Sequence, residues 1–336
     1  MAFRSRLLFI TNPQTRPDGI REIIKDFRTI WLDYHELQDD KKLYHYTTDE
    51  GLKGIFDNRT LWLGHYSTFN DPLELQYGKN LVQEILEAKI EEFGQAPLGQ
   101  FYESISQTIS GFGKTLQHAY ITCFCESGNL LSQWRAYSDN GGGYCVGFDF
   151  SSGVQIKPKS IDIDEGNSPI LRKVIYKRER QIRFVEAVLN EAENSLEKIL
   201  GNVDRNNAGL LAAKIGGDIV NLLVDIILSY KHPAFEEEQE WRMIRTKLDS
   251  HEPDKLNFRS SDGGLVPYLK NNIYSEQEEN FVFPVSSIQL GPSLEAERNE
   301  IAIQLFLNHV RTTNDSEEIK IPEEIEIKGP NFDLRT

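Results

Sequence analysis

The sequence predicts an α+β protein, because short β-prone runs and longer helical patterns follow one another in an irregular order. Runs with strand character occupy four positions: 119–125, 144–150, 240–246 and 285–290. Apolar residues at helical spacing occupy five: 18–37, 73–92, 130–137, 177–231 and 294–310. The strands predict a buried sheet, and the helices predict layers that cover it.

The composition is that of an acidic protein with enough apolar residues for a large core. Of 336 residues, 39% are hydrophobic and 10% aromatic, and the net charge is −15. This charge repels phosphate backbones and argues against tight non-specific nucleic-acid binding. The three cysteines form no C-x-x-C pair, and the N-terminal apolar run is too short for a signal peptide. We therefore expect a soluble cytoplasmic protein.

Neither a membrane span nor a metal site is expected. The most apolar stretch, residues 210–228, is interrupted by Lys214, Asp218 and Asp225, so it does not suit the bilayer core. The histidines are scattered, and their spacing to nearby carboxylates matches no standard metal motif. The function is therefore expected to depend on side chains without a bound metal ion.

Three parts are expected along the chain. Residues 1–40 predict an N-terminal helical segment, residues 41–312 the main domain, and residues 313–336 an acidic tail that is only partly ordered. Within the main domain, residues 177–231 predict a helical insertion between two halves of the sheet.

His45 is a candidate functional residue because it lies where a short strand gives way to a helix. Residues 43–46 are aromatic and β-prone, and the capping box that runs from Thr47 to Glu50 predicts the start of the helix. Asn70 lies in a loop that ends in Asp-Pro. Such residues are more often turn formers than ligands, so both interpretations of Asn70 stay open.

A run of acidic residues ends inside the predicted strand 240–246. Glu238 and Glu240 would lie on one face of that strand, where two like charges are unfavourable. Either the face is solvated or a site requires the two carboxylates.

Six motifs, taken in order, resemble a bacterial family of proteins of unknown function, family 2971. They are LYHYTTDEGLKGIF at 43–56, FNDPLE at 69–74, CF at 123–124, W-x-x-Y at 134–137, YCVGF at 144–148 and EQEWR at 238–242. That family in turn resembles the ADP-ribosyltransferase fold. The resemblance implies a split, mostly antiparallel sheet with flanking helices, and NAD as a substrate.

The resemblance also implies roles for individual residues. Glu240 would stabilise the positive charge that develops on the ribose and hold a ribose hydroxyl, and Glu238 would position or deprotonate the acceptor. His45 would hydrogen-bond the ribose. The backbone near Tyr46 and Thr47 would hold the nicotinamide amide.

Three further side chains are candidates for NAD binding. Trp134 and Tyr137, three residues apart on a helix, offer a stacking surface, and Arg242 offers a guanidinium for the pyrophosphate. Each has an alternative: Trp134 and Tyr137 as core residues, and Arg242 as the partner of a preceding glutamate. His45 has a similar alternative as a core histidine. No Ser-Thr-Ser motif follows Ile121, so the residue of the middle motif stays open, with Tyr137 as an alternative.

Two classes of function follow. The first is NAD-dependent mono-ADP-ribosylation of a protein or nucleic acid, as in a bacterial toxin or anti-phage defence effector, with NAD hydrolysis as a close variant. The acidic charge favours a protein acceptor. The second is a non-catalytic module that binds a nucleotide or a protein partner, such as an antitoxin, through the same residues.

Overall fold

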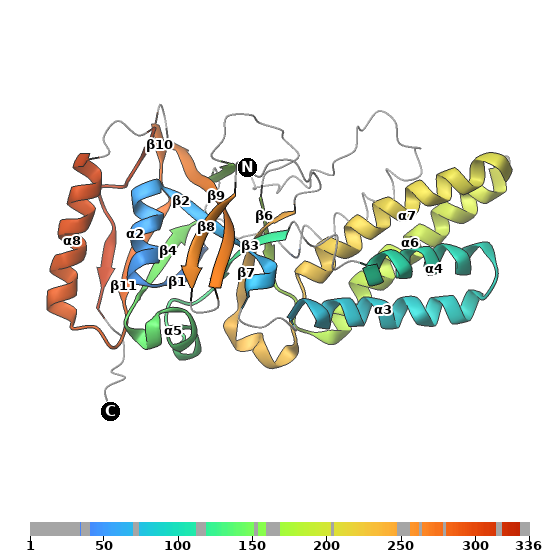
Figure 1. The fold of residues 1–336 in the computed structure, drawn as a ribbon, viewed down its shortest axis with the longest axis horizontal. Helices are drawn as coiled ribbons and strands as arrows, with labels where there is room; N and C mark the ends of the chain where they lie inside the picture. Colours follow the sequence, from blue (N-terminus) through green and yellow to red (C-terminus); the bar gives the residue numbers. More distant parts are fainter. Residues whose placement is uncertain are drawn as a thin grey trace.

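The computed structural model describes residues 34, 41–69, 74–111, 119–150, 154–158, 169–202, 205–246, 256–261, 264–277, 280–313 and 318–329. The predicted N-terminal segment and its helix at 18–37 lie almost wholly outside these residues, and so does Asn70. The described part confirms an α+β fold in which a strongly branched sheet lies beside a bundle of long helices (Figure 1).

The branching of the sheet begins at β3 (Ala119–Cys125). One edge of β3 pairs along its whole length with β7 (Glu240–Thr246), which also pairs with β6 (Ile170–Lys173). The other edge is shared, because β1 (Lys42–Thr47) pairs at Cys125 and β2 (Thr60–His65) at Tyr120 and Ile121. The two strands therefore leave β3 in different directions and open a fork beside residues 122–124.

Each arm of the fork continues into its own set of strands. From β1 the order is β4 (Tyr144–Asp149), β11 (Val285–Leu290) and β13 (Glu326–Lys328). From β2 the sheet continues into the long strand β9 (Gly264–Gln277). The partners of β9 are β5 (Val154–Pro158), β8 (Asn257–Ser261) and β10 (Asn280–Val282), and β10 pairs with β12 (Ile319–Lys320).

Most strand pairs are antiparallel, and the two parallel pairs both involve the C-terminal residues. The predicted acidic tail contributes β12 to one arm and β13 to the other. Backbone pairing thus orders residues 318–329 in spite of their charge, because a strand at a sheet edge contributes backbone hydrogen bonds whatever its side chains are.

The two faces of the sheet are covered differently. Helices α2 (Asp49–Asn58) and α8 (Ala296–Thr313) pack on one face through a large apolar core that includes Phe56, Phe148 and Leu307. The short helix α5 (Leu131–Tyr137) packs on the other face, where Trp134 meets Tyr46 and two cysteines. The carboxylates of the candidate site lie on this second face.

Helix α2 begins one residue later than the sequence predicted. Its N-cap is Thr48, whose side chain accepts a hydrogen bond from the Gly51 amide, and not Thr47. Thr47 is instead the last residue of β1, where it pairs with Tyr144. The pairing with β4 holds Thr47 in extended backbone and moves the cap to the next hydroxyl.

The helical bundle is built from two helix pairs rather than from one insertion. Helices α6 (Arg178–Asn202) and α7 (Arg205–Leu228) confirm helix in the predicted stretch 177–231. Helices α3 (Glu74–Phe93) and α4 (Pro97–Ser110), which connect β2 to β3, pack against them in a shared apolar core. Figure 1 shows these four helices extending away from the sheet side by side.

The bundle core gives a direct prediction about stability. Leu223 of α7 is fully buried, so replacing it with alanine is expected to lower the free energy of unfolding by about 2 to 5 kcal/mol. Urea denaturation followed by circular dichroism measures this loss. The matched control is Leu305→Ala on α8, where the leucine is 65% exposed and the expected change is within about 0.5 kcal/mol. Equal losses in the two variants would contradict the assignment of Leu223 to the core.

Among the described residues, no helix is long and apolar enough to cross a membrane.

Candidate functional site

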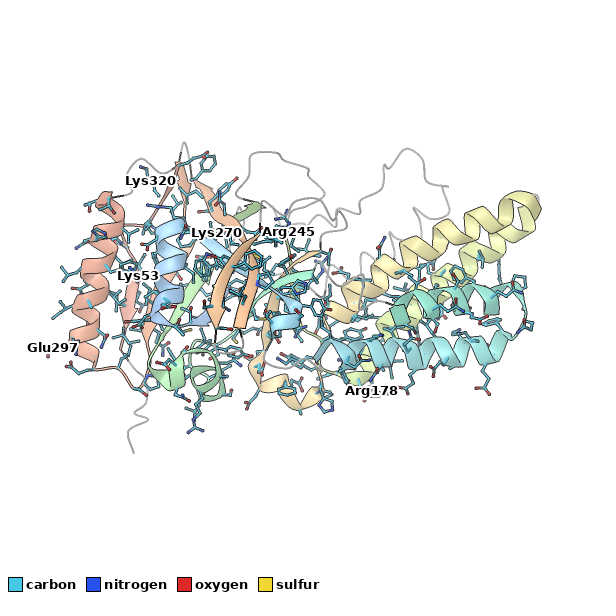
Figure 2. The ribbon with its side chains drawn as sticks, viewed as in Figure 1. Lys53, Arg178, Arg245, Lys270, Glu297 and Lys320 are labelled. Atoms are coloured by element: carbon cyan, nitrogen blue, oxygen red, sulfur yellow. The ribbon has the colours of Figure 1, made fainter. Side chains whose placement is uncertain are left out.

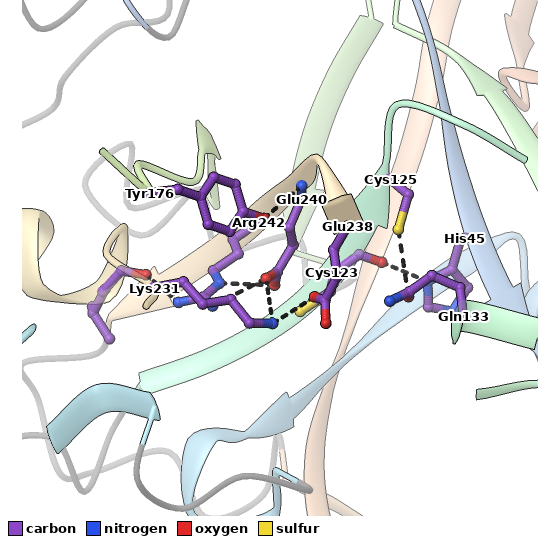
Figure 3. A network of polar contacts seen from close by, with 10 residues as sticks. His45, Cys123, Cys125, Gln133, Tyr176, Lys231, Glu238, Glu240 and Arg242 are labelled. Atoms are coloured by element: carbon purple, nitrogen blue, oxygen red, sulfur yellow. Dashed lines mark hydrogen bonds and ion pairs between the residues drawn. The ribbon is translucent and has the colours of Figure 1, made fainter. Parts of the chain in front are cut away.

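The candidate site lies where the fork of β3 meets the beginning of β7. Figure 3 shows the polar side chains that gather there, from Tyr176 and Lys231 at one end to Gln133 and His45 at the other. They come from β1, β3, α5, the segment after β6, the segment after α7, and the beginning of β7. Residues that are distant in the sequence are brought together because β3 contacts β1 on one edge and β7 on the other.

His45 fills the fork between β1 and β2. Its Nδ1 lies 2.8 Å from the Cys123 carbonyl oxygen. The pairing of β1 with β3 is at Cys125, so at Cys123 the His45 side chain takes the place of a strand partner on that edge. Because a carbonyl only accepts, Nδ1 carries the hydrogen and the neutral ring presents Nε2 as an acceptor. Burial lowers the pKa of His45, against the effect of the bond to Cys123, so the neutral form is favoured.

Glu240 is the most enclosed carboxylate of the site. It is 4% exposed, and both its oxygens accept hydrogen bonds from Arg242, at 2.8 Å from Nε and 3.2 Å from Nη2. Oε2 also lies 3.0 Å from the Lys231 ammonium. The Glu240 amide donates to the Tyr176 hydroxyl at 2.9 Å, which fixes the first residue of β7.

Glu238 does not lie on the strand, contrary to the sequence prediction. It ends the 3-10 helix η7 (Pro233–Glu238), and Gln239 then adopts a left-handed conformation with φ of 46° before β7 begins. The turn nevertheless brings the two carboxylates to one cation, because Oε2 of Glu238 lies 2.6 Å from the Lys231 ammonium. The sequence offered two explanations for the two carboxylates, a solvated face or a site that requires them, and neither included this buried lysine.

Lys231 is the functional candidate that sequence reasoning missed. It lies three residues beyond the end of α7 and is 5% exposed. Burial by itself lowers the pKa of its ammonium, but the charges of Glu240 and Glu238 outweigh burial and raise it. Burial raises the pKa of the Glu238 carboxyl. The attraction of Lys231 opposes this effect, and the negative charge of Glu240 adds to it. Only the sequence spacing Lys231, Glu238, Glu240 was available as a signal, and spacing alone does not show that the three side chains meet.

Arg242 is fully buried and is used by the protein itself. Besides the two bonds to Glu240, its Nη1 donates to the Leu228 carbonyl at 2.8 Å, at the end of α7. Burial lowers the pKa of Arg242, although an arginine remains charged at neutral pH. The geometry corresponds to the alternative in which Arg242 neutralises a preceding glutamate, and it leaves no exposed part of the guanidinium for a pyrophosphate.

Cys123 connects the two halves of the site. Its carbonyl oxygen accepts a hydrogen bond from His45, and on the other edge of β3 it pairs with Arg242, whose side chain holds the Glu240 carboxylate. Burial, followed by the charge of Glu240, raises the pKa of the thiol well above its usual value, so this cysteine is not an activated nucleophile. Its backbone instead places His45 on one side of β3 and the Arg242–Glu240 pair on the other.

Helix α5 contributes one buried and one exposed aromatic residue. Trp134 is fully buried, edge-on to Tyr46 with ring centroids 5.0 Å apart, so it has no free face for a ligand in this structure. Tyr137 is 43% exposed. Burial of its inner part raises the pKa of Tyr137, and the nearby Cys123, Glu238 and Glu240 contribute. Of the two predicted stacking residues, Tyr137 is therefore the one that is open to solvent.

Tyr46 is a scaffold for α5. Its hydroxyl donates to the Ser127 carbonyl at 3.0 Å and accepts from the Leu130 amide at 2.8 Å. It therefore holds the loop that leads into the helix on which Tyr137 lies. Among the described residues, no group of three or more histidine, cysteine or acidic side chains is placed to hold a metal ion.

A second charged cluster lies at the end of β3. Oε1 of Glu126 accepts hydrogen bonds from Trp241 at 2.8 Å and from Lys173 at 2.9 Å, and Oε2 pairs with Lys41 at 2.8 Å. Burial alone would raise the pKa of Glu126, but these donors hold it at about 2. The cluster ties β6 and β7 to the start of β1.

The Glu126 cluster predicts a dependence of stability on pH. A lowered pKa in the folded state stabilises the protein above the unfolded pKa of about 4.5, and this contribution is lost as the pH falls toward 2. We expect Glu126→Gln to lower the free energy of unfolding at pH 7 by an amount on the order of 2 to 3 kcal/mol. Urea denaturation at several pH values should show the difference from wild type shrinking between pH 5 and pH 2. The exposed Glu103→Gln is the control, and a difference independent of pH would contradict the assignment.

The fold and the site define an α+β protein whose polar centre is a buried pair of carboxylates held by a lysine and an arginine beside a forked sheet. Residues 133–243 match the family model described as a protein of unknown function, DUF2971. The match covers less than half of the chain, and over this stretch it supports the expected resemblance. It contains Tyr137, Lys231, Glu238 and Glu240, whereas His45 lies outside it. No curated protein and no solved structure matches the chain.

Proposed function

We propose that this protein binds NAD beside the fork of β3 and transfers its ADP-ribosyl group to a macromolecular acceptor. The observation that carries the proposal is the position of Cys123, whose carbonyl oxygen binds His45 and which pairs with Arg242, the partner of Glu240. An imidazole acceptor and a carboxylate are thereby held on the two sides of one strand end, with the exposed ring of Tyr137 nearby.

The chemistry of each group suits this reaction. Nε2 of neutral His45 has no hydrogen-bond partner among the described residues and suits a ribose hydroxyl as donor. When the bond between ribose and nicotinamide breaks, nicotinamide leaves with the electron pair and positive charge develops on the sugar. A carboxylate such as Glu240 stabilises that charge. The raised pKa of Glu238 suits a base that takes the proton of the acceptor as the new bond to ribose forms.

The second candidate is a non-catalytic module that binds a nucleotide or a protein partner. It is favoured by the complete engagement of Glu240, whose two oxygens are held by Arg242 and Lys231 in a region that is almost closed to solvent. Hydrolysis of NAD without an acceptor is a variant of the first candidate. A toxin or anti-phage effector in the cytoplasm is the setting that we propose for the transferase.

A pair of measurements separates these candidates. Thermal denaturation with NAD, ADP-ribose or nicotinamide should show a higher melting temperature if the folded state binds them. Incubation with cell extract and NAD labelled in the adenylate part should then label a macromolecule. A shift without label transfer and without release of nicotinamide supports the binding module. No shift at millimolar NAD excludes both uses of NAD.

A further inference from the structure

The Lys231 side chain occupies the position in the site where a positive charge is most stable. Its ammonium lies 2.6 Å from Glu238 and 3.0 Å from Glu240, and 5.2 Å from the centre of the Phe235 ring. Two carboxylates and the face of an aromatic ring are the groups that attract a cation in proteins. The chain therefore supplies its own cation to this position.

Lys231 differs from Arg242 in how firmly it belongs to the cluster. Arg242 lies on the same strand as Glu240, is fully buried and holds both oxygens of that carboxylate in a fork. Arg242 alone is therefore sufficient to neutralise Glu240. Two carboxylates face two cations here, so removal of the ammonium would leave one negative charge, at Glu238.

The Lys231 backbone is fixed by hydrogen bonds, whereas its side chain is flexible. The Lys231 amide donates to the Ile175 carbonyl at 3.3 Å, and the Lys231 carbonyl accepts from the buried side chain of Gln181 at 3.0 Å. These bonds fix the main chain against α6 and the end of β6. The ammonium is carried on a flexible four-carbon stem, and Phe235, which it contacts, is 39% exposed.

We infer that Lys231 is an internal counter-ion that holds Glu238 in the resting protein and is displaced when a ligand brings a positively charged ring to the same position. This inference rests on the proposed function, since the pyridinium ring of NAD is such a ligand and the sugar cation formed from it is another. Lys231 is then a residue that controls access to the carboxylates. It has no part in making or breaking bonds.

A charged probe and its neutral counterpart test the displacement. We expect Lys231→Met to bind the cation 1-methylnicotinamide about tenfold more tightly than the wild type does at low salt, because the competing ammonium is gone. The affinity for neutral nicotinamide should change less than about twofold. Isothermal titration calorimetry measures both affinities. The matched control is Lys89→Met, which removes another partly buried lysine, paired with Glu193 at 2.7 Å in the helical bundle.

The outcomes separate this inference from the proposed function. Equal changes for the two probes, or no binding of the cation by Lys231→Met, would overturn the role of Lys231. If this variant does not fold, NMR of ¹⁵N-lysine-labelled wild type decides instead: saturating 1-methylnicotinamide should remove the protected Lys231 ammonium signal, and an unchanged signal overturns the inference. Displacement without any transfer from NAD would keep the counter-ion and exclude the transferase. Transfer at equal rates in wild type and Lys231→Met would keep the transferase and exclude the counter-ion role of Lys231.

Discussion

Replacing Arg242 by methionine is expected to lower the free energy of unfolding by about 3 to 5 kcal/mol. The side chain is fully buried, and its loss leaves the enclosed Glu240 without the partner that holds both its oxygens. It also leaves the Leu228 carbonyl at the end of α7 without its donor. The substitution therefore weakens the sheet and its junction with the helical bundle at once. Urea denaturation followed by tryptophan fluorescence measures the loss.

The control for this variant is Arg298→Met on the exposed surface of α8, where a change within about 0.5 kcal/mol is expected. A double variant that also carries Glu240→Gln should recover part of the loss, because the carboxylate that lost its partner is then neutral. Losses that simply add would show that the two side chains are not coupled, in conflict with the two hydrogen bonds between them.

Replacing Glu240 by glutamine is expected to reduce both the release of nicotinamide from NAD and the transfer of label by at least about 100-fold. The amide keeps the shape of the side chain but has no charge to stabilise the sugar cation. Glu238→Gln should reduce transfer by a similar factor, because the acceptor must lose a proton when it bonds to the ribose. Nicotinamide release should be much less affected, because water can take the place of the acceptor, although it reacts more weakly. Nicotinamide release and label transfer are measured side by side.

Folding must be shown for these two variants before their rates are compared. Melting temperatures and circular dichroism spectra serve this purpose, and the exposed Glu237→Gln, from the same acidic run, is the matched control. Label transfer that survives Glu240→Gln would remove Glu240 from the reaction. A loss of nicotinamide release in Glu238→Gln equal to that in Glu240→Gln would contradict the separate role of Glu238.

The strands that the sequence predicted well are buried on both of their faces. The ranges 119–125 and 240–246 correspond to β3 and β7, and 285–290 corresponds to β11. A continuous apolar run marks β3, because both its faces are covered. In β7 and β11, apolar residues such as Trp241 and Ile288 alternate with buried polar ones. The hairpin of β8 and β9 was not predicted, since β8 is mostly exposed and carries polar residues. An edge strand is held by backbone bonds that leave little trace in the sequence.

The site divides in the same way. Motifs in the sequence singled out His45, Tyr137, Glu238 and Glu240. The structure places His45, Glu238 and Glu240 in the polar group of Figure 3, and Tyr137 at the end of α5. The lysine that joins the two glutamates was not found, because its position depends on where α7 ends and on the left-handed turn at Gln239. Charged residues outside this cluster, such as those labelled in Figure 2, include both the exposed Glu297 and the buried Arg245, and the sequence alone does not distinguish them.

The sequence by itself determined the class of fold, the limits of β3, β7 and β11 and of helix α3, and the residues that deserve a functional test. Local periodicity and apolar runs carry that information, because they depend only on neighbours along the chain. Only the tertiary structure decided that β1 and β2 share one edge of β3, that Arg242 serves Glu240, and that Lys231 closes the pair of carboxylates. Pairing between distant strands and the balance of buried charges arise from contacts across space, and the burial of a charge is tolerated only when such a partner is in place.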